Sequence, residues 1–137
     1  MDSKMKKVIF ILIIVFIAVG FYFQKFFTKF NLPTEIQNVT IDGHVYKLLV
    51  ADNPIEYTNG LMNVRELHNA DGMVFLFDKP KIQIFWNQNT FVDLDVYWMN
   101  GDTVVGHDSL PSIEKSKSVV IIQSNQPVDK VVEIIRR

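Results

Sequence analysis

The chain of 137 residues contains no cysteine. It therefore forms no disulfide, offers no thiolate nucleophile and has no sulfur ligand for zinc, which removes several classes of enzyme and metal protein. It also has no cysteine to carry a lipid. We expect the folded part of the chain to be stabilised by packing, and its length is sufficient for one hydrophobic core.

The chain also lacks an excess of positive charge beyond its first segment. From Leu32 onward, nine Lys and Arg stand against fourteen Asp and Glu, a net charge of −5 with His neutral, whereas the whole chain carries −1. An acidic domain repels a phosphate backbone, so we expect no nucleic-acid partner. The sequence has no internal repeat and no low-complexity tract, which indicates a single domain.

No two histidines are close enough in sequence to form a local metal motif. His44 lies beside an expected turn, His68 in an expected loop and His107 near the end of an expected strand. Metal motifs usually place two ligands a few residues apart. Met62, Met73 and Met99 could bind copper(I), but methionines within apolar runs usually fill the core. We therefore expect neither a metal nor a cofactor.

One long apolar run is present near the amino terminus. Residues 8–23 read VIFILIIVFIAVGFYF and follow three lysines at positions 4, 6 and 7. Extended to residue 27, this run would form a helix of roughly 30 Å at about 1.5 Å per residue, which matches a hydrocarbon core. We predict a membrane contact through residues 8–27, within a cytoplasmic stub and anchor at residues 1–31. The lysines favour a cytoplasmic amino terminus.

The folded domain would then lie outside the cytoplasm, in a periplasmic or extracellular space, after a tether at residues 32–38. A cleaved signal peptide is the alternative, because Ala18, Val19 and Gly20 have the small residues that a signal peptidase requires. Cleavage there would give a secreted protein that begins FYFQKFF. This apolar end is unfavourable for a soluble protein, so we favour the uncleaved anchor.

Two local signals open the domain. Residues 39–50 predict a β-hairpin, because Asp42 and Gly43 favour the positive backbone angles of a two-residue turn. Asp52 or Asn53 can cap a helix that begins at Pro54. We expect this helix to run over residues 54–62.

The remaining sequence predicts β strands. Short runs rich in branched and aromatic residues are separated by turn clusters such as residues 78–80 and 100–102. The expected strands are residues 73–77, 82–86, 94–99, 104–108, 119–123 and 131–135. Strands at this spacing indicate a sandwich or a small barrel. Trp98 alternates with Leu94 and Val96, which places it in the core.

The segment from Trp86 to Asp95 concentrates polar residues between two apolar strands. Asn89 and Thr90 can cap a turn, and Asp95 can tie a loop to the sheet. The same side chains can instead line a cleft in which Trp86 forms an aromatic wall for a small ligand or sugar ring. Asp93 and Asp95 would lie on one face of an extended strand, about 6.6 Å apart, which suits paired-carboxylate catalysis.

Four short words occur in a fixed order along the domain. They are GLM at Gly60–Met62, GMVFLF at residues 72–77, FWNQNT at residues 85–90 and LDV at residues 94–96. These words resemble the domain of unknown function 192 (DUF192) family of extracytoplasmic proteins, whose usual pattern is GLM, GM with an apolar strand, FWMKNT and PLDV. The resemblance implies a mainly β fold, a compact barrel-like β-sandwich with one short helix near an open end, over residues 39–137.

The resemblance also singles out residues within the words. Asn89, Thr90 and Asp95 match its polar signature, and together with Trp86 they are our predicted ligand-binding residues. The structural part of the motif matches Gly60, Leu61, Met62, Gly72 and Met73. We expect positive backbone angles at the two glycines. The apolar members should fill the core with Phe75 and Phe77.

The chain departs from the family pattern at several places. Val64 stands where the family usually has an arginine, although Arg65 follows directly. Asn87 and Gln88 replace Met and Lys, which removes a cation that could bind an anionic ligand. The resemblance further implies a final strand beyond Arg137, and the loss of this strand would expose a sheet edge to a partner.

Three functions therefore remain open for the domain. The first is binding of a small molecule, a glycan or an envelope partner near Trp86 to Asp95. The second is a structural or protein-interaction module that docks through its carboxyl-terminal edge and has no ligand site. The third is a hydrolase that uses Asp95, although no nucleophilic constellation is present and a role without catalysis is favoured.

Overall fold

The computed structural model describes residue 5, residues 12–19 and residues 31–137. The chain divides into two units, residues 1–31 and residues 32–137. Residues 12–19 are helical, but the predicted membrane segment lies largely outside the described residues. Within the described ranges, no helix is both long and apolar enough to cross a membrane. The membrane anchor therefore stays a prediction.

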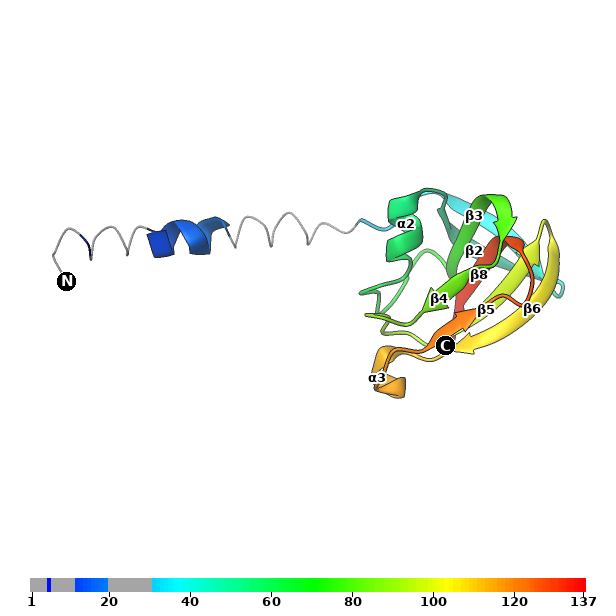
Figure 1. Ribbon diagram of the computed structural model, residues 1–137. Coiled ribbons are helices and arrows are strands. Elements are labelled where there is room, and N and C mark those ends of the chain that lie inside the picture. Colours follow the sequence, from blue (N-terminus) through cyan, green and yellow to red (C-terminus); the bar gives the residue numbers. More distant parts are fainter. Residues whose placement is uncertain (1–4, 6–11, 20–30) are drawn as a thin grey trace. The chain divides into compact units, whose positions relative to one another are not determined.

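The second unit is mainly β, as predicted (Figure 1). Its main sheet has the strand order β1-β2-β3-β8-β5-β6, and all neighbours are antiparallel except β2 and β3. A second sheet contains β4 and β7. The strands are β1 (Ile36–Ile41), β2 (His44–Ala51), β3 (Gly72–Lys81), β4 (Ile84–Trp86), β5 (Leu94–Asn100), β6 (Thr103–Leu110), β7 (Ile121–Gln123) and β8 (Val128–Ile135).

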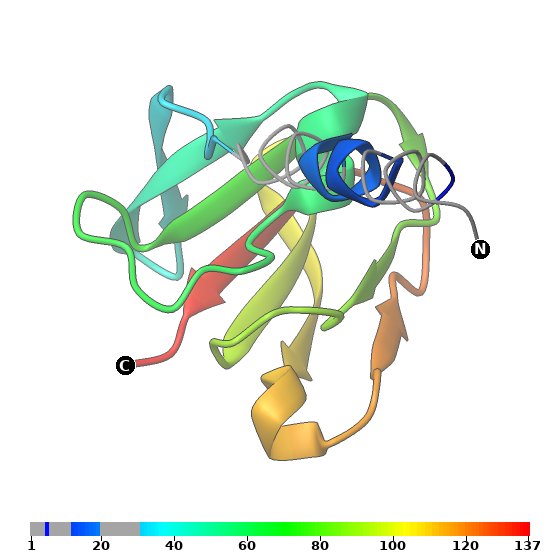
Figure 2. The ribbon, with the colours of Figure 1, turned by 90° about the vertical axis from the view of Figure 1, so that its left-hand side faces the viewer.

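The main sheet is not closed into a barrel, because its edge strands β1 and β6 do not pair with each other. The barrel-like form that we expected is therefore an open, curved sheet with the β4–β7 ribbon at its side (Figure 2). Two short helices, α2 (Pro54–Asn59) and α3 (Ile113–Ser116), complete the unit. The sequence did not predict α3.

The two faces of the main sheet form separate hydrophobic clusters. Alternate residues of each strand point to opposite faces, so Leu49 and Met73 join the larger cluster while Leu48 and Val74 join the smaller one. Trp98 is 2% exposed in the larger cluster, as predicted. Both clusters consist of residues from Leu32 onward, so the second unit contains its own core and can fold by itself.

Local sequence signals explain the first elements. Asp42 and Gly43 have φ angles of 50° and 79°, which confirms the predicted turn between β1 and β2. Asn53 caps α2, since its side chain accepts a hydrogen bond from the backbone N–H of Glu56. The helix ends at Asn59 rather than at Met62, because Gly60 takes a positive φ of 46°.

Three other predictions were wrong. Residues 78–80, expected as a turn, belong to β3, whose pairing with β8 becomes irregular between Leu76 and Lys81. Gly72 does not have a positive φ; a Cβ atom there would lie 1.8 Å from the carbonyl oxygen of Glu133, so close strand approach requires the glycine. Strand β8 is not at an edge, because it pairs with both β3 and β5.

Candidate functional site

The four predicted ligand-binding residues do not form one site. Trp86 and Thr90 line the same small pocket. Asn89 is exposed in the turn after β4 and has a positive φ of 54°. Asp95 alternates with the core residues Leu94 and Val96, so its side chain lies on the opposite face of the sheet.

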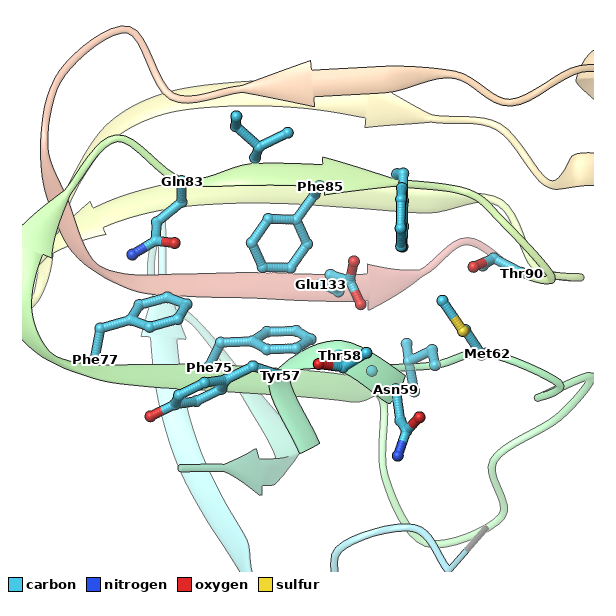
Figure 3. Close-up of a pocket in the computed structure, with 14 residues that line it drawn as sticks. Tyr57, Thr58, Asn59, Met62, Phe75, Phe77, Gln83, Phe85, Thr90 and Glu133 are labelled. Carbon is cyan, nitrogen blue, oxygen red and sulfur yellow. The ribbon is translucent and has the colours of Figure 1, made fainter. Parts of the chain in front are cut away.

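The pocket is lined by residues of α2 and of the segment that follows it, and by residues of β3, β4 and β8. Its volume is about 110 Å³. Aromatic rings dominate its walls. They belong to Tyr57, Phe75, Phe77, Phe85 and Trp86. Figure 3 shows the labelled rings of Phe75 and Phe85 on two sides of the pocket, with Glu133 drawn between them. The arrangement is a narrow recess with largely aromatic walls and one acidic side chain, and its uncharged polar lining residues are Thr58, Asn59, Gln83 and Thr90.

The turn after α2 sets one wall of the pocket. The backbone N–H of Gly60 donates to the carbonyl of Glu56 and ends the helix. A Cβ atom at Gly60 would lie 3.3 Å from the Phe75 ring, so glycine permits the turn to pack closely on this ring. Leu61 is buried, as predicted, whereas Met62 is only half buried and lines the pocket.

The opposite wall is held by contacts between aromatic rings. Phe85 meets Phe75 edge to face, with ring centroids 4.8 Å apart, and meets Trp98 at 5.7 Å. Tyr57 packs against Phe77 at 4.8 Å, and its hydroxyl donates to the carbonyl of Leu76. Such geometries are favourable beyond the buried area alone. Phe77 is therefore half buried at the pocket rather than in the core as expected.

Glu133 lines the pocket and was not predicted from the sequence. Its side chain is 4% exposed, and its cross-strand partners Met73 and Val96 are both fully buried. Among the described residues, no hydrogen-bond donor and no cation pairs with its carboxyl. Burial alone raises the pKa of Glu133 to about 8, because a low-dielectric surrounding disfavours the charged form.

The sequence places Glu133 within an apolar strand segment, although its burial depends on the pairing of β8 with β3 and β5. The β8 segment reads VDKVVEII, and Glu133 shares a strand face with Val131. An acidic residue on an apolar strand face is rarely fully buried without a partner. Such a position favours a functional role over a solvated one.

Asn87 connects β4 to α3 and supports the pocket from outside. Its side chain is fully buried, donates to the carbonyl of Pro111 and to Ser116 Oγ at 2.8 Å each, and accepts from the backbone N–H of Val120 at 2.7 Å. This asparagine is one of the departures from the family word, and in this chain it forms a structural hydrogen-bond network.

We expect Asn87→Ala to lower the free energy of unfolding by about 2–3 kcal/mol, because the change leaves buried backbone groups without partners. Urea denaturation of residues 32–137 measures this loss. Asn89→Gly is the matched control, since an exposed residue at positive φ should change stability by no more than about 0.5 kcal/mol. Equal losses in the two variants would contradict the assigned role of Asn87.

The acidic residues proposed for catalysis are both engaged elsewhere. Asp95 accepts from Arg136 Nε at 2.8 Å, and His107 lies 3.5 Å away. Asp93 pairs with Lys115 Nζ at 2.9 Å and accepts from the Ser112 N–H, and these hydrogen bonds hold its pKa below the ordinary value. Both carboxylates are therefore neutralised by cations outside the aromatic pocket.

Arg65 follows Val64, the position at which the family usually has an arginine, and it also lies outside the pocket. It pairs with Glu114 at 2.8 Å and stacks over the Phe91 ring at 4.2 Å. Among the described residues, no group of three or more His, Asp or Glu side chains is arranged to hold a metal ion.

The family model for DUF192, described as uncharacterized ACR, matches residues 37–136. The chain belongs to the DUF192 family. Three of the four DUF192 words contribute residues to the aromatic pocket. GLM directly follows α2, GMVFLF forms the first part of β3, and FWNQNT forms the end of β4 and the turn after it. The fourth word, LDV, supplies core residues of β5.

Solved structures similar to this DUF192 chain come from two bacteria. One is a protein from Sinorhizobium meliloti described as a candidate transcription regulator, with 28% identity, a TM-score of 0.58, and coverage of 73% of this chain and 78% of that one. The other is a protein of unknown function from Novosphingobium aromaticivorans, with 26% identity, a TM-score of 0.57, and coverage of 72% and 70%. No curated protein matches the chain.

Proposed function

We propose that this DUF192 domain binds a small molecule in the aromatic pocket and that the Glu133 carboxyl is the polar group that recognises it. The observation that carries the proposal is a buried carboxyl without a protein partner inside an aromatic recess. An unpaired buried acid costs stability, and a ligand that pairs with it would recover this cost. Small-molecule sites commonly combine apolar walls with a few polar groups.

The pocket is also where the family's own words converge, which supports a shared binding role. We retain the predicted anchor at residues 8–27 as part of the proposal, so that the pocket would work at a membrane and outside the cytoplasm. The description of the S. meliloti protein as a transcription regulator does not suit this domain, whose net charge of −5 from Leu32 onward disfavours nucleic acid.

An amide NMR titration of residues 32–137 tests the proposal. We would add pooled short alkylamines, monosaccharides and short carboxylic acids, and expect shifts confined to pocket residues such as Gly60, Met62, Trp86 and Thr90. Glu133→Gln should weaken the observed binding by at least about tenfold, since it removes the ionisable carboxyl and retains the shape of the side chain.

Asp95→Asn is the matched control. It changes an acidic residue of the same sheet on the opposite face and should leave binding unaltered. A folded domain whose pocket responds to none of the three pools would contradict the proposal and favour the interaction module. Equal loss of binding in both variants would contradict the assignment of the site to Glu133.

A further inference from the structure

We infer that the ligand of this pocket presents a compact ammonium cation to Glu133, an inference that rests on the proposed ligand-binding function. The pocket contains an acidic side chain and no basic one. Its lining residues include no Lys, Arg or His, and Tyr57 is the other titratable member. An anionic ligand would thus meet no positively charged side chain in the pocket lining.

The walls of the pocket match a cation as well. Five of the lining side chains are aromatic, and the faces of aromatic rings attract ammonium groups, most strongly quaternary ones. The space is small. A volume of about 110 Å³ is below the roughly 150 Å³ of a cavity that binds benzene, which suits a group of about five heavy atoms.

Charge balance favours the same conclusion. Asp93 and Asp95, two other acidic residues of the domain, each pair with a cation, Lys115 and Arg136 respectively. Glu133 has none among the described residues, and its register neighbours on β3 and β5 are the apolar Met73 and Val96. A ligand cation would supply the missing partner.

The binding should be linked to the release of one proton. The empty pocket holds Glu133 largely protonated at neutral pH, because burial raises its pKa to about 8, whereas the cation requires the carboxylate. No other ionised group faces Glu133 from the pocket lining, since the Tyr57 hydroxyl is directed to the carbonyl of Leu76. Affinity should therefore rise about tenfold per pH unit below the pKa and level off above it.

Three probes of similar shape and different charge test the inference on residues 32–137: tetramethylammonium, tert-butanol and trimethylacetate. Amide NMR at pH 8.5 would give their dissociation constants. We expect tetramethylammonium to bind at least about tenfold more tightly than the other two, with shifts at Gly60, Phe85 and Trp86. Its affinity should fall about tenfold from pH 7 to pH 6.

Two variants keep the test decisive. Glu133→Gln should remove the preference for the cation, and a dispersed amide spectrum shows that the variant is folded. Phe85→Leu keeps the wall apolar but removes one ring, so it should weaken tetramethylammonium about threefold or more and leave tert-butanol unchanged.

Tighter binding of tert-butanol or trimethylacetate at the pocket would overturn the cation inference and leave the proposed ligand-binding function standing. If none of the three probes shifts the pocket residues, the cation inference is likewise overturned. The wider proposal is then judged by the monosaccharide and carboxylic acid pools described above.

Discussion

The free energy of unfolding of residues 32–137 will fall by about 4 kcal/mol between pH 5 and pH 8.5. The cause is Glu133, whose pKa rises from the ordinary value of 4.5 to about 8 on folding because the side chain is buried. Below pH 4.5 both the folded and the unfolded states hold the proton, so the residue contributes nothing. Between pH 4.5 and about pH 8 the unfolded state loses the proton while the folded state retains it, so the free energy of unfolding declines as the pH rises. Above the folded pKa the loss is complete.

Urea denaturation at intervals of pH measures this decline. A loss of this size is a large share of the roughly 5–15 kcal/mol that stabilises a typical domain. Glu133→Gln is the control, because an amide does not titrate and its stability should be nearly constant across the same range. A decline of equal size in the variant would assign the effect to other groups and remove Glu133 from the account.

Gly72→Ala should destabilise the domain by more than about 3 kcal/mol or prevent folding. The new Cβ atom would lie 1.8 Å from the carbonyl oxygen of Glu133 and 2.8 Å from its carbonyl carbon. These are backbone atoms of β8, so no side-chain rotation relieves the clash and the two strands must separate. Soluble expression followed by urea denaturation measures the effect.

Gly43→Ala provides the comparison for this variant. Gly43 has a φ of 79° and nothing within 4 Å of the added Cβ atom, so its substitution costs about 1 kcal/mol of backbone strain alone. The difference between the two alanine variants isolates the close approach of β3 and β8. If the two losses were alike, the strand contact would not be the reason for Gly72.

The sequence predicted the elements that depend on neighbouring residues. Asp42 and Gly43 formed the expected turn because two-residue hairpins need positive φ angles, and Asn53 capped α2 as its side-chain chemistry indicates. The same local reasoning failed at residues 78–80. There, pairing of β3 with β8 continues to Lys81 and overrides the turn preference of Asp78 and Pro80.

The candidate site was predicted only in part. Trp86 and Thr90 line the pocket, and their role in ligand binding stays a prediction. The position of Asp95 on the opposite face follows from its alternation with Leu94 and Val96, a pattern that the sequence already contained. The burial of Glu133 could not be derived locally, because it results from long-range pairing of β8 with both β3 and β5.

The most direct measurement is a carbon-13 NMR titration of the Glu133 side-chain carboxyl in residues 32–137, with and without tetramethylammonium. We predict a titration midpoint near pH 8 for the free domain, in line with the pKa of about 8 that burial produces, and a lower midpoint when the cation is present. A free midpoint near 4.5, the ordinary value for glutamate, would show a hydrated carboxyl and contradict the pocket as a recognition site.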